Sequence, residues 1–289
     1  MWAVLFLPVV LQQKEQQRRS YITISMIHTT SIRLVIAGTV QSKHTAKHYY
    51  ILATNHRILH TSQMTATHKA KQALRKQIRT SISSLSPQEI SQQSTQVWER
   101  VFQLPEYQSS QSVGIFLSMP KGEIQTDEAC SRVLADGKML YVPRVGLDFE
   151  QCDMDLIRVP FDDYQFAKKN NVSFYNDWPR NKWGIPEAPA DDVKYQIAHS
   201  GDIDLLIVPG LGFDENGGRL GQGKGYYDRF IHSMREGQTQ QDDGASLKPI
   251  LLAVGLTPSF VQEGIPMMKH DFQMDMLVLP DAMFTMEKN

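Results

Sequence analysis

Apolar residues recur every three to four positions between residues 69 and 83, which predicts an amphipathic helix with a basic polar face. A second helix is predicted to begin after Ser86. The sequence Ser86-Pro87-Gln88-Glu89 supplies an N-cap, a proline at the first helical position and a capping-box acid. The apolar positions of this helix continue to the segment before Pro105.

Beyond Pro105, short apolar runs alternate with further helical patterns. A helix is predicted from Thr126 or Asp127 to about Ala135, and another after Gly225. A segment rich in Pro and Trp, 178–189, is expected to be an ordered loop. Strands are predicted at 112–118, 138–145, 154–159, 204–208, 249–256 and, as the last strand, 274–279. The order of strands and helices predicts a single α/β domain, a mostly parallel sheet with flanking helices in three layers.

Residues 1–63 differ in composition from the rest of the chain. They hold five of the nine histidines and seven Lys or Arg, but Glu15 is their one acidic residue. We expect a leader outside the folded domain 64–289, either poorly ordered or an over-extended gene model with the true start at Met64. A mitochondrial transit peptide is the competing interpretation, because such peptides lack acids. The apolar run 2–11 is too short to span a membrane.

Composition narrows the function classes. The 289 residues are 41% hydrophobic, enough for a large core, and the net charge of -1 gives no overall attraction to nucleic acid or to an anionic membrane. We therefore expect neither as a partner, and we expect a monomer. Cys130 and Cys152 show no disulfide framework and no metal-ligand spacing, and are expected to be small buried residues. The low-complexity segment 237–245 is expected to be a surface loop.

The chemistry concentrates in residues 204–228. A buried-strand pattern runs into seven glycines between Pro209 and Gly225, with Arg219 and Lys224 among them. Glycines let backbone N–H groups approach an anion, and the helix predicted after Gly225 adds its N-terminus, so the stretch predicts a phosphate cradle. It nearly spells the P-loop pattern, but Gly225 stands where Ser or Thr would bind Mg²⁺. Asp228, about one helical turn on, is the alternative oxygen ligand.

Several blocks of this sequence together resemble the 5-formyltetrahydrofolate cyclo-ligase family, also called methenyltetrahydrofolate synthetase. They cover residues 69 to about 279 and keep the family's order, and the Gly-rich block is the longest and most specific. The blocks are KQALR at 71–75, FLSM at 116–119 with GEI at 122–124, YVPR at 141–144, WGIPE at 183–187, PGLGFD at 209–214 and GRLGQGKGYYD at 218–228.

The resemblance implies an enzyme of one-carbon metabolism, a ligase that closes 5-formyltetrahydrofolate to 5,10-methenyltetrahydrofolate with ATP and Mg²⁺. It implies release of ADP and phosphate through a phosphorylated formyl intermediate, with folate polyglutamates among the substrates. Location in the cytoplasm is expected, or in mitochondria if the leader is real. A different class of function, a non-catalytic protein that binds reduced folate or nucleotide, is the alternative, although such a protein would normally have lost a metal aspartate or a loop glycine.

The resemblance also assigns roles to individual residues. It implies metal binding by Asp228 and Asp271, and catalytic roles for Arg219, Lys224 and Tyr226. Without the resemblance, Asp271 would be interpreted as a helix or turn cap. The folate-contacting residues would be Leu117, Glu123, Trp183, Gln222, Gly223, Lys224, Gly225 and Tyr226, with a merely structural role open for Trp183 and for one of the two tyrosines. The ATP-contacting residues would be Lys71, Gln72, Ala73, Leu74, Arg75, Arg219, Leu220, Gly221, Gln222, Gly223, Lys224, Gly225, Tyr226 and Tyr227.

Overall fold

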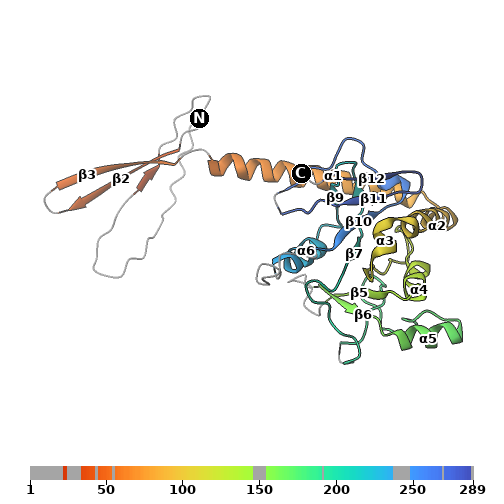
Figure 1. Ribbon diagram of the computed structural model, residues 1–289. Coiled ribbons are helices and arrows are strands. Elements are labelled where there is room, and N and C mark those ends of the chain that lie inside the picture. Colours follow the sequence, from red (N-terminus) through yellow and green to blue (C-terminus); the bar gives the residue numbers. More distant parts are fainter. Residues whose placement is uncertain are drawn as a thin grey trace. The chain divides into compact units, whose positions relative to one another are not determined.

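The computed structural model of the chain describes residues 22–24, 34–42, 45–53, 56–145, 154–190, 192–236, 248–268 and 270–287 (Figure 1). Two compact units divide at Ala66. In the first, β1 (Ile22–Ile24), β2 (Leu34–Ser42) and β3 (Thr45–Ala53) form an antiparallel sheet. The prediction that residues 1–63 are a leader stays a prediction. Cys152 and the predicted loop 237–245 lie outside the described residues.

The first helices follow the predicted pattern. α1 (His56–Ser83) begins earlier than the predicted residue 69 and crosses into the second unit. α2 (Pro87–Gln103) has the predicted capping box, in which Ser86 Oγ accepts from the Glu89 amide at 3.2 Å and Glu89 Oε2 accepts from the Ser86 amide at 2.7 Å. α3 (Pro105–Ser109) follows directly. The capping chemistry therefore fixes where the second helix begins.

The second unit is built on a seven-stranded sheet with the order β12-β11-β10-β7-β4-β5-β6. The five strands from β11 to β5 pair in parallel, and the two edge strands β12 and β6 pair antiparallel. This confirms the predicted mostly parallel sheet. The strands are β4 (Ser112–Gly114), β5 (Met139–Val145), β6 (Met154–Arg158), β7 (Leu205–Val208), β10 (Ile250–Val254), β11 (Met276–Val278) and β12 (Met283–Thr285).

Helices cover both faces of this sheet. Along β7, Leu205 and Ile207 belong to one hydrophobic cluster, which includes residues of α2 and of α4 (Asp127–Ala135). Leu206 and Val208 belong to the opposite cluster, which includes residues of α6 (Tyr226–Glu236). Figure 1 shows α2, α3 and α4 on one side of β7 and β10, and α6 on the other. Side chains alternate across a strand, so a strand buried on both faces is apolar throughout.

Two strand predictions need correction. The strand predicted at 112–118 ends at Gly114, because the chain then leaves the sheet and the Ser118 amide donates to Thr126 Oγ1 at 3.0 Å. The strand at 274–279 is not the last, since β12 follows and pairs with it across a tight turn. The remaining helix, α5 (Phe161–Asn170), lies in a segment whose pattern gave no prediction.

The Pro- and Trp-rich segment 178–189 is an ordered loop, as predicted, with one isolated bridge between Arg180 and Pro186. Cys130 is fully buried, also as predicted. In the part of the chain that the structure describes, no helix is both long and apolar enough to cross a membrane.

Candidate active site

The glycine-rich stretch begins with a small hairpin that is organised by one buried carboxylate. β8 (Gly212–Phe213) and β9 (Arg219–Leu220) pair antiparallel. Between them, Asp214 is 3% exposed, and its carboxylate accepts hydrogen bonds from the amides of Asn216, Gly218 and Ile265 at 2.9, 2.8 and 2.7 Å. Three amide donors satisfy a buried carboxylate and fix the turn that delivers Arg219.

Helix α1 contacts the loop that follows this hairpin. Arg75 Nε donates to the carbonyl oxygen of Gly221 at 2.9 Å, and Arg79 Nη2 donates to Gln222 Oε1 at 2.8 Å. Gly223 has a φ of 105°, and a Cβ there would lie 3.5 Å from Arg75 Cζ. Burial, then the neighbouring Arg79, lowers the pKa of Arg75, while Asp271 opposes this. The basic face predicted for this helix therefore meets the predicted phosphate cradle.

Two ion pairs join the predicted phosphate-binding cations to the predicted metal ligands. Lys71 Nζ bonds Asp271 Oδ2, and their side chains are 8% and 11% exposed. Arg219 Nη2 lies 2.8 Å from Asp228 Oδ1, with side chains 5% and 22% exposed. A buried cation needs a partner, and these carboxylates supply one.

Arg219 is further held inside the site. Its Nη1 donates to the Pro209 carbonyl at 3.1 Å, and its guanidinium carbon lies 5.9 Å from the centroid of the Tyr227 ring. Its Nε is buried and has no hydrogen-bond partner among the described residues. An unsatisfied buried donor of this kind is a functional-site signal, because a bound acceptor would satisfy it.

The other predicted ATP-contacting residues differ in exposure. Gln72 and Ala73 are exposed, and Gln72 Nε2 lies 3.1 Å from His68 Nε2 on the same helix. Leu74 packs against the hydrophobic core and Leu220 is fully buried. Lys224 is exposed on the loop, where a flexible cation can reach a phosphate.

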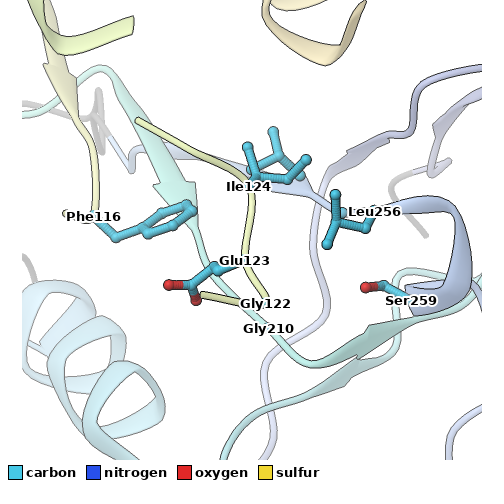
Figure 2. A pocket seen from close by; sticks show the side chains of 9 residues that line it. Phe116, Gly122, Glu123, Ile124, Gly210, Leu256 and Ser259 are labelled. Atoms are coloured by element: carbon cyan, nitrogen blue, oxygen red, sulfur yellow. The ribbon is translucent and has the colours of Figure 1, made fainter. Parts of the chain in front are cut away.

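Glu123 lines a small pocket next to the glycine-rich stretch. Figure 2 shows its carboxylate between Phe116 on one side and Leu256 and Ser259 on the other, with Gly210 nearby. The cavity volume is about 10 Å³, room for about one water molecule. Burial raises the pKa of Glu123 to about 7, against a hydrogen bond that its Oε2 accepts from the Met119 amide at 2.9 Å. A ligand as large as a pterin therefore requires the pocket to widen.

Two predicted folate-contacting aromatic residues touch each other where α6 begins. The rings of Trp183 and Tyr226 meet edge to face, with centroids 6.1 Å apart. Asn181 Oδ1 accepts from the amides of Trp183 and Ile185 at 2.9 and 3.2 Å, which shapes the turn that carries the tryptophan. Such a pair can frame a flat ligand. Leu117 is 3% exposed and belongs to the core, while its neighbour Phe116 lines the pocket.

Tyr227, the residue after Tyr226, packs against both hydrophobic clusters. Its hydroxyl is buried with no hydrogen-bond partner among the described residues. Burial raises its pKa, and the nearby carboxylate of Glu123 adds to the shift. The glycine-rich stretch adjoins the Glu123 pocket through Gly210, which lines that pocket.

The donor set suits a magnesium ion that arrives with phosphates. Among the described residues, no three His, Cys, Asp or Glu side chains gather into a metal cluster. Mg²⁺, however, keeps several waters and is usually held by one or two carboxylates together with substrate phosphates. Asp228 meets that requirement, because its side chain is 22% exposed and one of its oxygens, Oδ1, takes the Arg219 pair.

Sequence reasoning missed two residues of this site. The sequence alone gives Asp214 no role beyond its place in the PGLGFD block, and it places Arg79 only on the basic polar face of the predicted helix. Arg79 lies four residues after Arg75, as Arg75 lies after Lys71, and that spacing alone places all three on one side of α1. The buried role of Asp214 has no comparable signal, since Asp before Gly-rich turns is common.

The fold and the site together define an α/β protein in which a glycine-rich loop is contacted by cations of α1 and adjoins a small pocket that holds Glu123. The model of the 5-formyltetrahydrofolate cyclo-ligase family matches residues 67–280. The chain therefore belongs to the 5-formyltetrahydrofolate cyclo-ligase family, an ATP-dependent ligase family of folate one-carbon metabolism whose substrates are 5-formyltetrahydrofolate and ATP. This confirms the resemblance and the expected enzyme class.

Curated relatives agree. The chain is 29% identical over 213 residues to the 5-formyltetrahydrofolate cyclo-ligase of Mus musculus, covering 74% of this chain and 95% of the relative. It is 30% identical over 217 residues to the Saccharomyces cerevisiae enzyme, covering 73% and 96%. A relative from Arabidopsis thaliana, named as mitochondrial, is 28% identical over 226 residues, covering 74% and 75%.

A solved structure shares the fold. The 5,10-methenyltetrahydrofolate synthetase of Aquifex aeolicus superposes with a TM-score of 0.56 at 25% identity, covering 76% of this chain and 94% of that one. The predicted α/β class is thereby confirmed.

Proposed function

We propose that this chain closes 5-formyltetrahydrofolate to 5,10-methenyltetrahydrofolate at the site formed by α1, the glycine-rich loop and the Glu123 pocket. The observation that carries the proposal is the contact of Arg75 with the Gly221 carbonyl, which brings the basic face of α1 onto the loop. Family membership supports the overall reaction. The residue roles are those that the resemblance implies, and the contacts of Lys71, Arg75 and Arg219 support them.

In the proposed reaction the formyl oxygen attacks the γ-phosphorus of ATP, and ADP leaves with the electrons of the broken P–O bond. N10 then attacks the activated formyl carbon and loses its proton, and phosphate departs as the C–O bond breaks. Phosphoryl transfer depends mainly on positioning and on neutralising charge. Lys71, Arg75, Arg219 and Lys224 supply that charge, and the unsatisfied Nε of Arg219 is suited to a phosphate oxygen.

The folate is proposed to enter beside Glu123, whose carboxylate can accept hydrogen bonds from the amino and N–H edge of a pterin. Trp183 and Tyr226 frame the ring, and Gln222 lies between the folate and the nucleotide. When bound, Mg²⁺ would neutralise charge on the phosphates, with Asp228 as its protein ligand and Asp271 as the second candidate. Lys71 and the Met268 amide both donate to Oδ2 of Asp271, so Oδ1 is the oxygen that would bind the metal.

Two further proposals concern the oligomeric state and the location of the protein. We propose that the protein acts as a monomer. A mitochondrial location is proposed as one alternative to the cytoplasm, since a relative from Arabidopsis thaliana is named as mitochondrial.

The proposal is tested by following the absorbance of the methenyl product with ATP, Mg²⁺ and 5-formyltetrahydrofolate. Product that requires ATP is expected. Arg75→Gln should raise KM for ATP by about tenfold or more, because a charged hydrogen bond at the loop is lost. Lys76→Gln, which removes an exposed cation from the same helix, should change it less than twofold. Absence of ATP-dependent product from the folded wild type would overturn the proposal.

A further inference from the structure

Helix α1 carries three cations on one side, and each contacts a different part of the site. Lys71 bonds Asp271, Arg75 bonds the Gly221 carbonyl, and Arg79 bonds the side chain of Gln222 at 2.8 Å. The residues are four apart, so their side chains stack along the helix. The first two fall within the family block at 71–75, and the third lies one turn beyond it.

We propose that Arg79 is a positioning residue that fixes the orientation of the Gln222 amide, and so makes Gln222 a hydrogen-bond donor toward the ligands. The inference rests on the proposed function, in which Gln222 contacts both substrates. It adds Arg79 to that site and assigns a donor role to the Gln222 amide.

The chemistry of the two side chains sets this donor role. A glutamine amide has one acceptor oxygen and one NH₂ donor, whereas a guanidinium can only donate. Because Arg79 donates to Oε1, the Nε2 group is left to face a partner. Such a partner must accept a hydrogen bond, as the oxygens of a phosphate or of a carboxylate do. Without Arg79, either end of the amide could turn toward the ligand.

The backbone makes such a restraint useful. Gln222 is exposed and lies between Gly221 and Gly223, and Gly223 has a positive φ of 105°. A glutamine between two glycines has little local restraint on its position. Contacts from α1 at Gly221 and Gln222 therefore hold in advance a loop that binding would otherwise have to order.

The first test compares Arg79→Gln with Lys76→Gln. Both substitutions remove one exposed cation from α1. Arg79→Gln is expected to raise KM for ATP and for 5-formyltetrahydrofolate about three- to tenfold, the effect of one charge-assisted hydrogen bond at a partly exposed site, with kcat within about twofold. Lys76→Gln should leave all three constants within about twofold. Equal effects of the two variants would overturn the proposal.

The second test asks whether Arg79 acts through Gln222. If it does, adding Arg79→Gln to Gln222→Ala should raise the two KM values little further. If the double variant instead raises KM by the product of the two single effects, the residues act independently and the proposal is overturned.

Gln222→Glu tests whether the side chain acts as a hydrogen-bond donor. It keeps an acceptor for Arg79 but removes the donor, and should raise both KM values at least as much as Gln222→Ala. A Gln222→Glu variant with wild-type KM values would contradict the assigned donor role.

These outcomes differ from a failure of the proposed function. If the wild type makes no methenyl product, the reaction itself is wrong. If the wild type is active and Arg75→Gln is impaired while Arg79→Gln resembles Lys76→Gln, the reaction stands and Arg79 is a solvated cation.

Discussion

The carboxyl group of Glu123 is held under Phe116 and beside Gly210, in a pocket with room for about one water molecule. Burial raises its pKa to about 7 from the ordinary value of 4.5, and one backbone hydrogen bond only partly offsets this. Near neutral pH the group can therefore change between a carboxylate and a neutral acid. A bound pterin that donates to the carboxylate would favour the ionised form.

The free energy of unfolding of the protein should depend on pH because of the Glu123 carboxyl group. A carboxyl with a raised folded-state pKa binds its proton more tightly in the folded state, so its contribution is fully present below pH 4.5 and is lost as the pH rises through about 7. The loss amounts to at most about 3 kcal/mol. We expect the free energy of unfolding, measured in urea, to fall less between pH 5 and pH 7.5 in Glu123→Gln than in the wild type. Glu99 is exposed, so the free energy of unfolding of Glu99→Gln should fall by as much as that of the wild type. If the free energy of unfolding of Glu123→Gln also falls by that amount, Glu123 is not the group responsible.

Asp214 is the second residue with a testable energetic role. Its carboxylate accepts from three amides in two segments, around Gly218 and at Ile265. In Asp214→Asn, an NH₂ group must face at least one of these N–H donors, so we expect a loss of about 1–3 kcal/mol in the free energy of unfolding. The exposed Asp281→Asn is the control and should change it by less than about 0.5 kcal/mol. Equal stabilities of the two variants would show that the Asp214 hydrogen bonds contribute nothing.

Among the elements, the β8–β9 hairpin depends on a glycine at its turn. Gly217 has a φ of 79°, and a Cβ there would lie 2.6 Å from the Met274 carbonyl oxygen. Gly137, at the end of α4, has nearly the same φ of 75°, but a Cβ there would meet nothing within 4 Å. The two positions separate backbone strain from steric contact.

Gly137→Ala should therefore cost about 1–2 kcal/mol of stability from backbone strain alone. Gly217→Ala should cost more than about 3 kcal/mol and should also weaken ATP binding, because the strand after the turn carries Arg219. Thermal or urea unfolding together with KM for ATP measures both effects. If the two alanine variants lose the same stability, the close approach of Met274 does not constrain the hairpin.

The sequence predicted elements best where a local rule decides them. The helix start at Ser86 and the buried strand β7 are predicted correctly, because capping residues and a continuous apolar run are visible in the sequence itself. The end of β4 at Gly114 is not predicted, because the apolar run continues to Leu117 although the Ser118 amide already bonds Thr126 outside the sheet. The hairpin of β8 and β9 is two residues per strand, too short for an alternating pattern.

The same distinction holds for the site. The glycines, Arg219 and Asp228 were found because they lie together in the sequence. The ion pair of Lys71 with Asp271 depends on segments that are distant along the chain, and no spacing rule relates them. The depth of Tyr227 and the raised pKa of Glu123 arise only from packing.

For the whole molecule, the residues proposed to act in catalysis all lie from Lys71 onward, and the family match begins at residue 67. A chain that starts at Met64 should therefore keep kcat and both KM values within about twofold of the full chain, since it retains every residue of the two hydrophobic clusters found among the described residues. Steady-state kinetics and thermal unfolding of the two chains measure this. A large loss of activity in the shorter, folded chain would assign a functional role to the first 63 residues.

The Lys71–Asp271 pair joins residues 200 positions apart, and the contact between Arg75 and Gly221 spans 146. During synthesis at about 5–20 residues per second, α1 leaves the ribosome roughly ten seconds or more before its partner segment exists. Contacts of such long range also slow folding, because the loop must close before the contact can form. The nucleotide half of the site is thus completed only when nearly the whole chain has been made. A nascent protein arrested before residue 271 should lack β11 and β12 as well as the partner of Lys71, and should fail to retain ATP.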